Sequence, residues 1–173
     1  MKKTTFFLIL SFLIISSLAS QSVSQVGFVI KKSVPSTNEI IVFVTNKDKD
    51  NIMKQAKMAQ VITKKKFSVY PIDKSIELTK KVRMISNKKN IAVFVVTDDS
   101  FFKPSVIKTI SDKLNSKGIP LFSNREKDTM VGAMIAIYKK DGTVEKHVNK
   151  ITASILKITI PADFLAKCII DVE

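Results

Sequence analysis

The sequence has few of the residues from which enzyme sites are most often built. It contains one cysteine (Cys168), one histidine (His147), four glycines and no tryptophan. A single cysteine cannot form an internal disulfide bond, and no histidine lies near Cys168 in the sequence to form a nucleophilic pair with it. The four glycines form no Gly-x-Gly-x-x-Gly motif, phosphate-binding loop or Gly-x-Ser-x-Gly motif. We therefore predict that the protein is not an enzyme and has no cofactor, and we interpret Cys168 as a small buried apolar residue.

Arginine is also rare, although the chain is strongly basic. Arg83 and Arg125 are the only arginines, and lysines spread along every segment account for most of the formal net charge of +14. Base recognition and paired contacts to phosphate favour arginine, and the sequence has no strip of aromatic and basic residues on which bases could stack. We therefore expect no nucleic-acid partner and interpret the lysines as a solvated surface.

The N-terminus carries the longest apolar stretch of the chain. Lys2 and Lys3 precede this stretch, which covers residues 6–18, and small residues flank Leu18 in Ser17-Leu18-Ala19. This order of parts is typical of a secretory signal peptide, and the alternative is an uncleaved anchor. The stretch is shorter than the roughly 20 residues that a bilayer span needs. We predict a signal peptide over residues 1–19, a periplasmic or secreted location, and no lipid anchor because no cysteine follows the apolar stretch closely.

From residue 38 onward, apolar runs typical of strands alternate with stretches whose apolar residues have helical spacing. The strand-like runs are residues 39–45, 67–72, 90–97, 119–122 and 131–138. The helical stretches are residues 46–66, 73–89 and 103–118. A further helix is predicted for residues 144–156, after the turn signal Asp141-Gly142, and it would carry His147 as a surface or packing residue.

Continuous apolar strands separated by helices are typical of a mainly parallel sheet that helices cover on both faces. The sequence therefore predicts a three-layer α/β sandwich of the flavodoxin-like or Rossmann-like type. We place this fold in a single domain over residues 38–173 and interpret residues 20–37 as a short strand or an extended lead-in.

Polar residues follow three of the predicted strands. In an open parallel sheet, ligands bind beyond the carboxyl ends of the strands, close to the point where the strand order reverses. The side chains expected at this edge are Thr45, Asn46, Thr97, Asp98, Asp99, Ser100, Phe101, Ser123 and Asn124. These nine residues form the predicted ligand site.

The adjacent carboxylates Asp98 and Asp99 allow three interpretations. They could bind Mg²⁺, act as general acid and base, or cap the helix that begins near Pro104. A catalytic acidic pocket needs further acids or a lysine from a neighbouring strand end, and the first strand has no acid directly at its tip. The sequence favours a cap that also contacts the ligand, without a metal. We expect Asn46 and Asp48 to cap the first helix in the same way.

Two phenylalanines follow the aspartates. Phe101 and Phe102 could face a ligand or a partner, or one of them could pack beneath the next helix. The sequence leaves both alternatives open.

The segment from Val93 to Tyr138 resembles the second lobe-forming stretch of ABC-transporter solute-binding proteins. In that family, a strand with a Thr- and Asp-rich tip leads through a helix to Ile-Pro-Val/Leu-Phe, a polar loop and Gly-Ala before the last strand. Ile119-Pro120-Leu121-Phe122 and Gly132-Ala133 match this pattern. The C-terminal tail also matches, at Val148-Asn149, Ala153, Leu156, Ile158, Ile160-Pro161 and Leu165. The resemblance covers residues 38–173.

This resemblance implies a periplasmic-binding-protein lobe that binds a small molecule at the strand tips, as part of ABC-type uptake or sensing. The tips that would face the solute are Thr97, Asp98, Asp99, Ser123 and Asn124. Family members enclose their solute between two lobes, whereas this chain is long enough for one. A homodimer, or pairing with another protein, would complete the cleft, and a membrane transporter or sensor would be the partner.

A second, weaker resemblance is to small exported α/β proteins that repress membrane-bound diguanylate cyclases. Gly132-Ala133-Met134-Ile135 and Val148-Asn149 fit the ending of those proteins, but their aromatic N-terminal entry and multiple cysteines are missing. This resemblance implies a regulatory module that binds the exported domain of a membrane sensor or cyclase.

Overall fold

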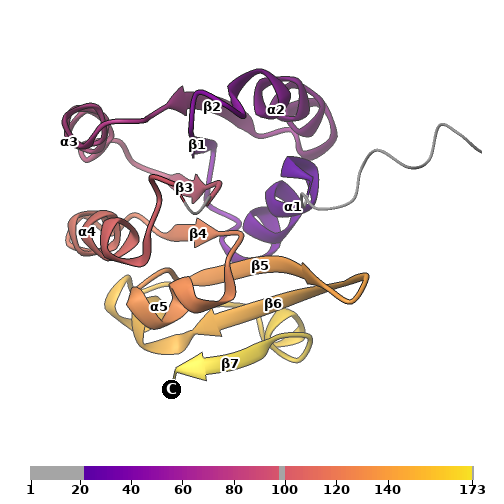
Figure 1. Ribbon diagram of the computed structural model, residues 1–173. Coiled ribbons are helices and arrows are strands. Elements are labelled where there is room, and N and C mark those ends of the chain that lie inside the picture. Colours follow the sequence, from indigo (N-terminus) through magenta and orange to yellow (C-terminus); the bar gives the residue numbers. More distant parts are fainter. Residues whose placement is uncertain (1–21, 98–99, 173) are drawn as a thin grey trace, which may run out of the picture.

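In the residues that the structure describes, seven strands form one sheet with helices on both faces (Figure 1). The structure is a computed structural model that describes residues 22–97 and 100–172, so the predicted signal peptide lies outside the described residues. The strands are β1 (Glu39–Val44), β2 (Lys66–Pro71), β3 (Ile91–Val95), β4 (Leu121–Ser123), β5 (Ile135–Lys140), β6 (Thr143–Asn149) and β7 (Ile169–Val172). The helices are α1 (Val23–Ser33), α2 (Lys49–Thr63), α3 (Ser75–Ile85), α4 (Pro104–Asn115), α5 (Lys150–Ile155), α6 (Ala162–Leu165) and the 3-10 helix η1 (Glu126–Val131).

The strand order is β2-β1-β3-β4-β5-β6-β7, and every neighbouring pair is parallel except β5 and β6. The first five strands have the flavodoxin-like order, in which the winding of the chain reverses between β1 and β3. Parallel neighbours need a long crossover connection, and α2, α3 and α4 supply three of them. The predicted three-layer α/β sandwich with a mainly parallel sheet is confirmed.

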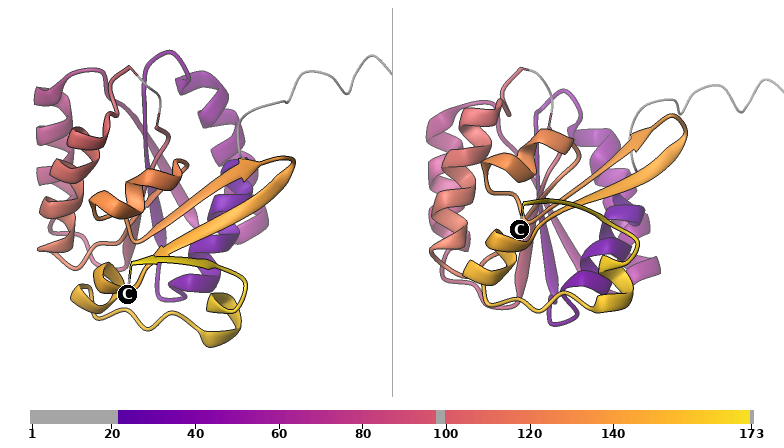
Figure 2. Two further views of the ribbon diagram at one scale, coloured as in Figure 1. Left: turned by 60° about the horizontal axis from the view of Figure 1, so that its bottom comes forward. Right: turned by 90° about the horizontal axis from the view of Figure 1, so that it is seen from below.

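The two faces of the sheet have separate cores, because successive residues of a strand point to opposite sides. On β1, Ile40, Val42 and Val44 belong to the core beneath α1 and α2. Ile41 and Phe43 belong to the core beneath α3 and α4. Figure 2 shows these two pairs of helices on opposite sides of the sheet. Burial on both faces explains why the sequence of this strand is a continuous apolar run.

Helix α1 replaces the strand or extended lead-in that we predicted for residues 20–37, so that prediction is wrong. Val23, Val26 and Ile30 follow helical spacing, are fully buried and pack within the same core as α2. The side chain of Ser22 caps the first turn. The β-branched residues of this segment favour a strand, but the burial of an apolar stripe outweighs such weak local preferences.

Strand β6 replaces the first half of the helix that we predicted for residues 144–156, and only α5 is helical there. The Asp141-Gly142 turn explains this difference. Its two residues have φ values of 49° and 82°, as a type I′ hairpin turn requires, and the chain folds back as an antiparallel strand. Val144 and Val148 are four residues apart, a spacing that fits one face of a strand as well as one face of a helix. His147 therefore lies on a strand, where it is 4% exposed.

Gly132 follows η1 and has a φ of 103°. A Cβ atom there would overlap Oγ of Ser111, which donates a hydrogen bond to the Gly132 carbonyl oxygen (2.5 Å). We predict that Gly132→Ala lowers the free energy of unfolding by about 2–5 kcal/mol, from positive φ and overpacking together. Gly118→Ala is the control, because Gly118 also has a positive φ (69°) but an added Cβ would meet nothing within 4 Å. Urea unfolding measures both losses, and equal losses would contradict the steric argument.

Candidate functional site

The carboxyl ends of the parallel strands bring the predicted loops to one edge of the sheet. Thr45 and Asn46 follow β1, Thr97 lies two residues beyond β3, and Asn124 follows β4. Strands β1 and β3 are neighbours and flank the point where the winding of the chain reverses. This is the place where open α/β sheets bind their ligands.

Asn46 is held by Asp73, which lies just beyond the carboxyl end of β2. The backbone N–H of Asn46 donates to Oδ1 of Asp73 (3.0 Å), and the Asn46 side-chain amide donates to Oδ2. The backbone N–H of Asp73 in turn donates to Oε2 of Glu77 in the first turn of α3 (3.1 Å). Asp48 is the N-cap residue of α2, but its side chain makes no capping hydrogen bond. The prediction that Asn46 and Asp48 cap this helix through their side chains is therefore wrong.

Thr97 and Asn124 join the tips of β3 and β4. Oδ1 of Asn124 accepts hydrogen bonds from the backbone N–H (2.6 Å) and from the hydroxyl (2.7 Å) of Thr97. Ser123 is fully buried at the end of β4, and its hydroxyl donates to the carbonyl oxygen of Arg125 (3.1 Å). The structure therefore brings Thr97 and Asn124 into contact, whereas Ser123 stabilises its own turn.

Thr45 differs from the other predicted site residues. It is 5% exposed, and its Oγ1 has no hydrogen-bond partner among the residues that the structure describes. A buried hydroxyl without a partner costs about 1–3 kcal/mol. Because Thr45 directly follows β1 at the reversal point, a polar ligand group could satisfy its hydroxyl there.

The loop between β3 and α4 holds the remaining predicted residues. Asp98 and Asp99 lie outside the described residues, so their capping or ligand-contact role stays a prediction. Ser100 is exposed and Phe101 is partly buried. The rings of Phe101 and Phe102 meet edge to face with 5.0 Å between their centroids, and Phe102 is fully buried in the core beneath α4. For Phe102, the packing alternative is correct.

Arg125 ties the loop after β4 to the loop after β3. Its Nε and one terminal nitrogen donate to Oδ1 of Asp128 (2.9 and 2.8 Å), and the same terminal nitrogen donates to the carbonyl oxygen of Phe102 (2.9 Å). Asp128 is fully buried, and Oδ2 has no partner among the described residues. Burial raises the pKa of the Asp128 carboxyl, and the Arg125 guanidinium opposes this rise. This ion pair therefore positions the strand tips that form the edge.

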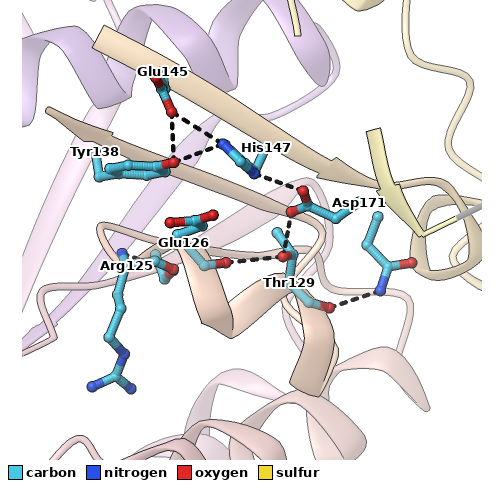
Figure 3. Close-up of polar contacts among 9 residues, drawn as sticks. Arg125, Glu126, Thr129, Tyr138, Glu145, His147 and Asp171 are labelled. Carbon is cyan, nitrogen blue, oxygen red and sulfur yellow. Dashed lines mark hydrogen bonds and ion pairs between the residues drawn. The ribbon is translucent and has the colours of Figure 1, made fainter. Parts of the chain in front are cut away.

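A second polar cluster joins β5, β6, β7 and η1 (Figure 3). The hydroxyl of Tyr138 donates to Oε2 of Glu145 (2.6 Å) and lies 2.7 Å from Nε2 of His147. Nδ1 of His147 lies 2.6 Å from Oδ1 of Asp171, whose Oδ2 accepts a hydrogen bond from the hydroxyl of Thr129 (2.6 Å). The chain of hydrogen bonds is complete when both ring nitrogens of His147 donate. Asp171 therefore links strand β7 to β6 through His147 and to η1 through Thr129.

The cluster changes the acidity of two of its members. Burial, the hydrogen bond to Glu145 and the negative charges of Glu126 and Glu145 raise the pKa of Tyr138 well above its ordinary value of 10.0. The hydrogen bond from Tyr138 lowers the pKa of Glu145. Within residues 22–97 and 100–172, no group of three or more His, Cys, Asp or Glu side chains is placed to hold a metal ion.

A groove of about 580 Å³ connects the carboxyl edge with this cluster. It is lined by Pro104, Asn124, Arg125, Glu126, Lys127, Tyr138 and Lys139. Six of these seven residues carry a charged or polar group, and Pro104 is the exception.

Sequence reasoning missed three features of this region. Asp73 directly follows the strand-like run 67–72, so the rule that selected the other tips would also have found it. The contact of Arg125 with Phe102 joins two loops 23 residues apart and leaves no local signal. The His147 cluster was hidden because we predicted a helix where β6 lies.

Removing the Arg125 side chain should leave Asp128 buried without its cation. We predict that Arg125→Ala lowers the free energy of unfolding by about 3 kcal/mol or more, since an unpaired buried charge is costly. The control is Lys108→Ala, which breaks an exposed pair with Asp112 (3.0 Å) and should cost less than about 0.5 kcal/mol. Chemical unfolding measures both variants, and similar losses would show that the buried pair is not important for stability.

The raised pKa of Tyr138 predicts how stability depends on alkaline pH. Below its ordinary value of 10.0, the phenol is neutral in both the folded and the unfolded chain and contributes no pH dependence. Above that value the unfolded chain loses the proton first, so stability falls by at most about 1.4 kcal/mol per pH unit. Tyr138→Phe should remove this part of the fall.

Urea unfolding over a series of alkaline pH values tests this expectation. The matched control is Tyr70→Phe, which removes a phenol that takes no part in the cluster. Parallel pH curves for the parent protein and Tyr138→Phe would contradict the argument.

No family model matches the chain, and no curated protein matches it either. Solved structures with the same fold include a conserved domain protein from Vibrio cholerae O1 biovar El Tor, with 18% identity and a TM-score of 0.73. An ABC domain from Streptococcus pneumoniae in complex with L-Trp has 17% identity and a TM-score of 0.72. A substrate-binding protein with adhesive properties from Clostridium difficile, in a ligand-free, open structure, has 14% identity and a TM-score of 0.72. They cover 85%, 85% and 89% of this chain, which spans only 59%, 59% and 61% of their own lengths. The predicted resemblance to a solute-binding-protein lobe is confirmed at the level of the fold.

Proposed function

We propose that this chain binds a small molecule non-covalently at the carboxyl edge of its sheet, between the tips of β1 and β3. The observation that carries the proposal is the buried hydroxyl of Thr45 at the reversal point of the sheet, which has no hydrogen-bond partner among the described residues. The neighbouring polar residues already have partners: Asn46 is hydrogen-bonded to Asp73, and Thr97 is hydrogen-bonded to Asn124. Thr45 therefore supplies a polar contact that a ligand could complete.

The edge favours a ligand with hydrogen-bond acceptors. Helix α2 begins three residues after Asn46, and its N-cap Asp48 makes no side-chain capping bond. The N–H groups of its first turn are directed toward the same edge and carry the positive end of the helix dipole. An amino acid carries a carboxylate that suits such donors, and the pneumococcal structure of the same fold is a complex with L-Trp. Amino acids are therefore the first ligands to test.

A single lobe provides one wall of a cleft. The chain spans about three fifths of the length of the matched structures. As part of the proposal, another copy of the chain or another protein supplies the second wall. We include export by the N-terminal signal and a role in ABC-type uptake or sensing in the proposal. The signal-peptide pattern supports the proposed export. The fold shared with solute-binding proteins supports the proposed role in uptake or sensing.

The experiment is a thermal-shift screen of the chain from residue 20 onward against amino acids, beginning with L-tryptophan, and then purines and sugars. The described residues of both cores begin at Val23, so this chain retains every described strand and helix. A ligand at a hundredfold excess over its Kd should add about 2.7 kcal/mol of stability. We predict that Thr45→Val removes most of this gain, while the ligand-free variant is as stable as the parent or up to about 1 kcal/mol more stable.

Thr63→Val is the matched control for this substitution. Thr63 is also buried, but its hydroxyl donates to the carbonyl oxygen of Ala59 (2.7 Å) at the far end of α2. This variant should lose about 1 kcal/mol of stability and keep the full gain from the ligand. An unchanged gain in Thr45→Val, or no ligand in the whole panel, would overturn the proposed site.

A further inference from the structure

Helix α2 has a second apolar stripe on the side away from its core. Its inner stripe, which includes Ile52 and Ala56, is buried against the sheet. On the outer side Met58, Val61 and Ile62 are 58%, 78% and 52% exposed. Residues three and four apart are neighbours on a helix surface, so these three side chains form one continuous stripe. Large apolar side chains that gather on a surface in this way mark an interaction site.

Helix α1 lies against α2 and adds to the same side of the molecule (Figure 1). Gly27 of α1 packs so closely on Thr63 of α2 and on Phe67 that an added Cβ would overlap the Phe67 ring. Its neighbour Phe28 is 41% exposed. The outer face of α1 and α2, defined by Phe28 and the stripe of α2, therefore carries four large apolar side chains.

The two helices that carry these apolar side chains are also rich in lysine. Helices α1 and α2 together contain five lysines, and their acidic content is a single aspartate, Asp50. The lysines are Lys31, Lys32, Lys49, Lys54 and Lys57. None of the five forms an ion pair with another described residue. The face is thus both apolar and positively charged.

We propose that the outer face of α1 and α2 docks on the surface of an anionic lipid bilayer. Helices with lysines beside exposed apolar residues lie in the interface of a membrane, where the apolar groups enter the acyl boundary and the lysines contact the headgroups. No helix in the described part of the chain is long and apolar enough to span a bilayer.

Charge argues against a second copy of the chain as the occupant. Two copies that met through this face would bring lysines against lysines, with one aspartate on each side to compensate. The whole chain adds to the attraction for an anionic surface. Without Lys2 and Lys3, the 29 basic residues become 27 against 15 acidic ones, a formal charge of +12.

Co-sedimentation with lipid vesicles tests this inference on the chain from residue 20 onward, which lacks the apolar N-terminal stretch. We expect binding to vesicles of equal parts phosphatidylcholine and phosphatidylglycerol and at least about tenfold weaker binding to phosphatidylcholine alone. Added salt should weaken the binding, because it screens the lysines. The triple variant Met58→Ser, Val61→Ser, Ile62→Ser should bind the anionic vesicles at least about tenfold more weakly than the parent.

The matched control is the double variant Ile76→Ser, Met84→Ser on α3, which removes exposed apolar side chains (63% and 47% exposed) from the opposite layer. It should bind like the parent, and thermal melts show that each variant is folded. Equal binding by the parent and the triple variant would overturn the proposal, as would an absence of binding to anionic vesicles. A dimer of the parent that dissociates in Val61→Ser would show that a second copy covers the face instead.

Discussion

The rest of the structure depends on strand β1, which is buried on both faces of the sheet. Its residues alternate between the two cores, with Val42 on the side of α1 and α2 and Phe43 on the side of α3 and α4. Strands buried on both faces are typical of parallel sheets, whose helical crossovers cover both faces. The chain therefore passes from β1 outward to β2 and back across to β3. This path creates the reversal point at which Thr45 lies.

The alternation of strands and helices could be predicted because local burial determines it. Residues 40–44 of the run 39–45 are all apolar, which is typical of a strand buried on both sides or of a buried helix, and the short length favours the strand. Two elements could not be predicted from local pattern alone. Val144 and Val148 fit either a helix or a strand, and a long-range contact between β5 and β6 selects the strand. In α1, burial against α2 selects a helix for a segment with β-branched residues.

The candidate site shows the same division between local and long-range information. Chain order placed Thr45, Thr97 and Asn124 at one edge, because the carboxyl ends of parallel strands lie together. The partners of these residues could not be predicted, since Asn46 meets Asp73 across 27 residues. These contacts decide which polar groups remain available for a ligand. Sequence alone predicted which loops lie at this edge, but only the folded structure shows that the Thr45 hydroxyl has no hydrogen-bond partner among the described residues.

The carboxyl edge and the outer face of α1 and α2 are separate surfaces that α2 connects. This helix begins at the edge, next to the tip of β1, and runs back along the sheet with its outer stripe turned away from the core. A bilayer against that stripe would lie parallel to the layers of the sandwich. The edge with Thr45 would then open sideways and stay accessible to a solute and to the second wall of a cleft. The proposed membrane docking and the proposed solute binding therefore make no competing demands on this fold, because the first uses the outer stripe of α2 and the second uses the edge where α2 begins.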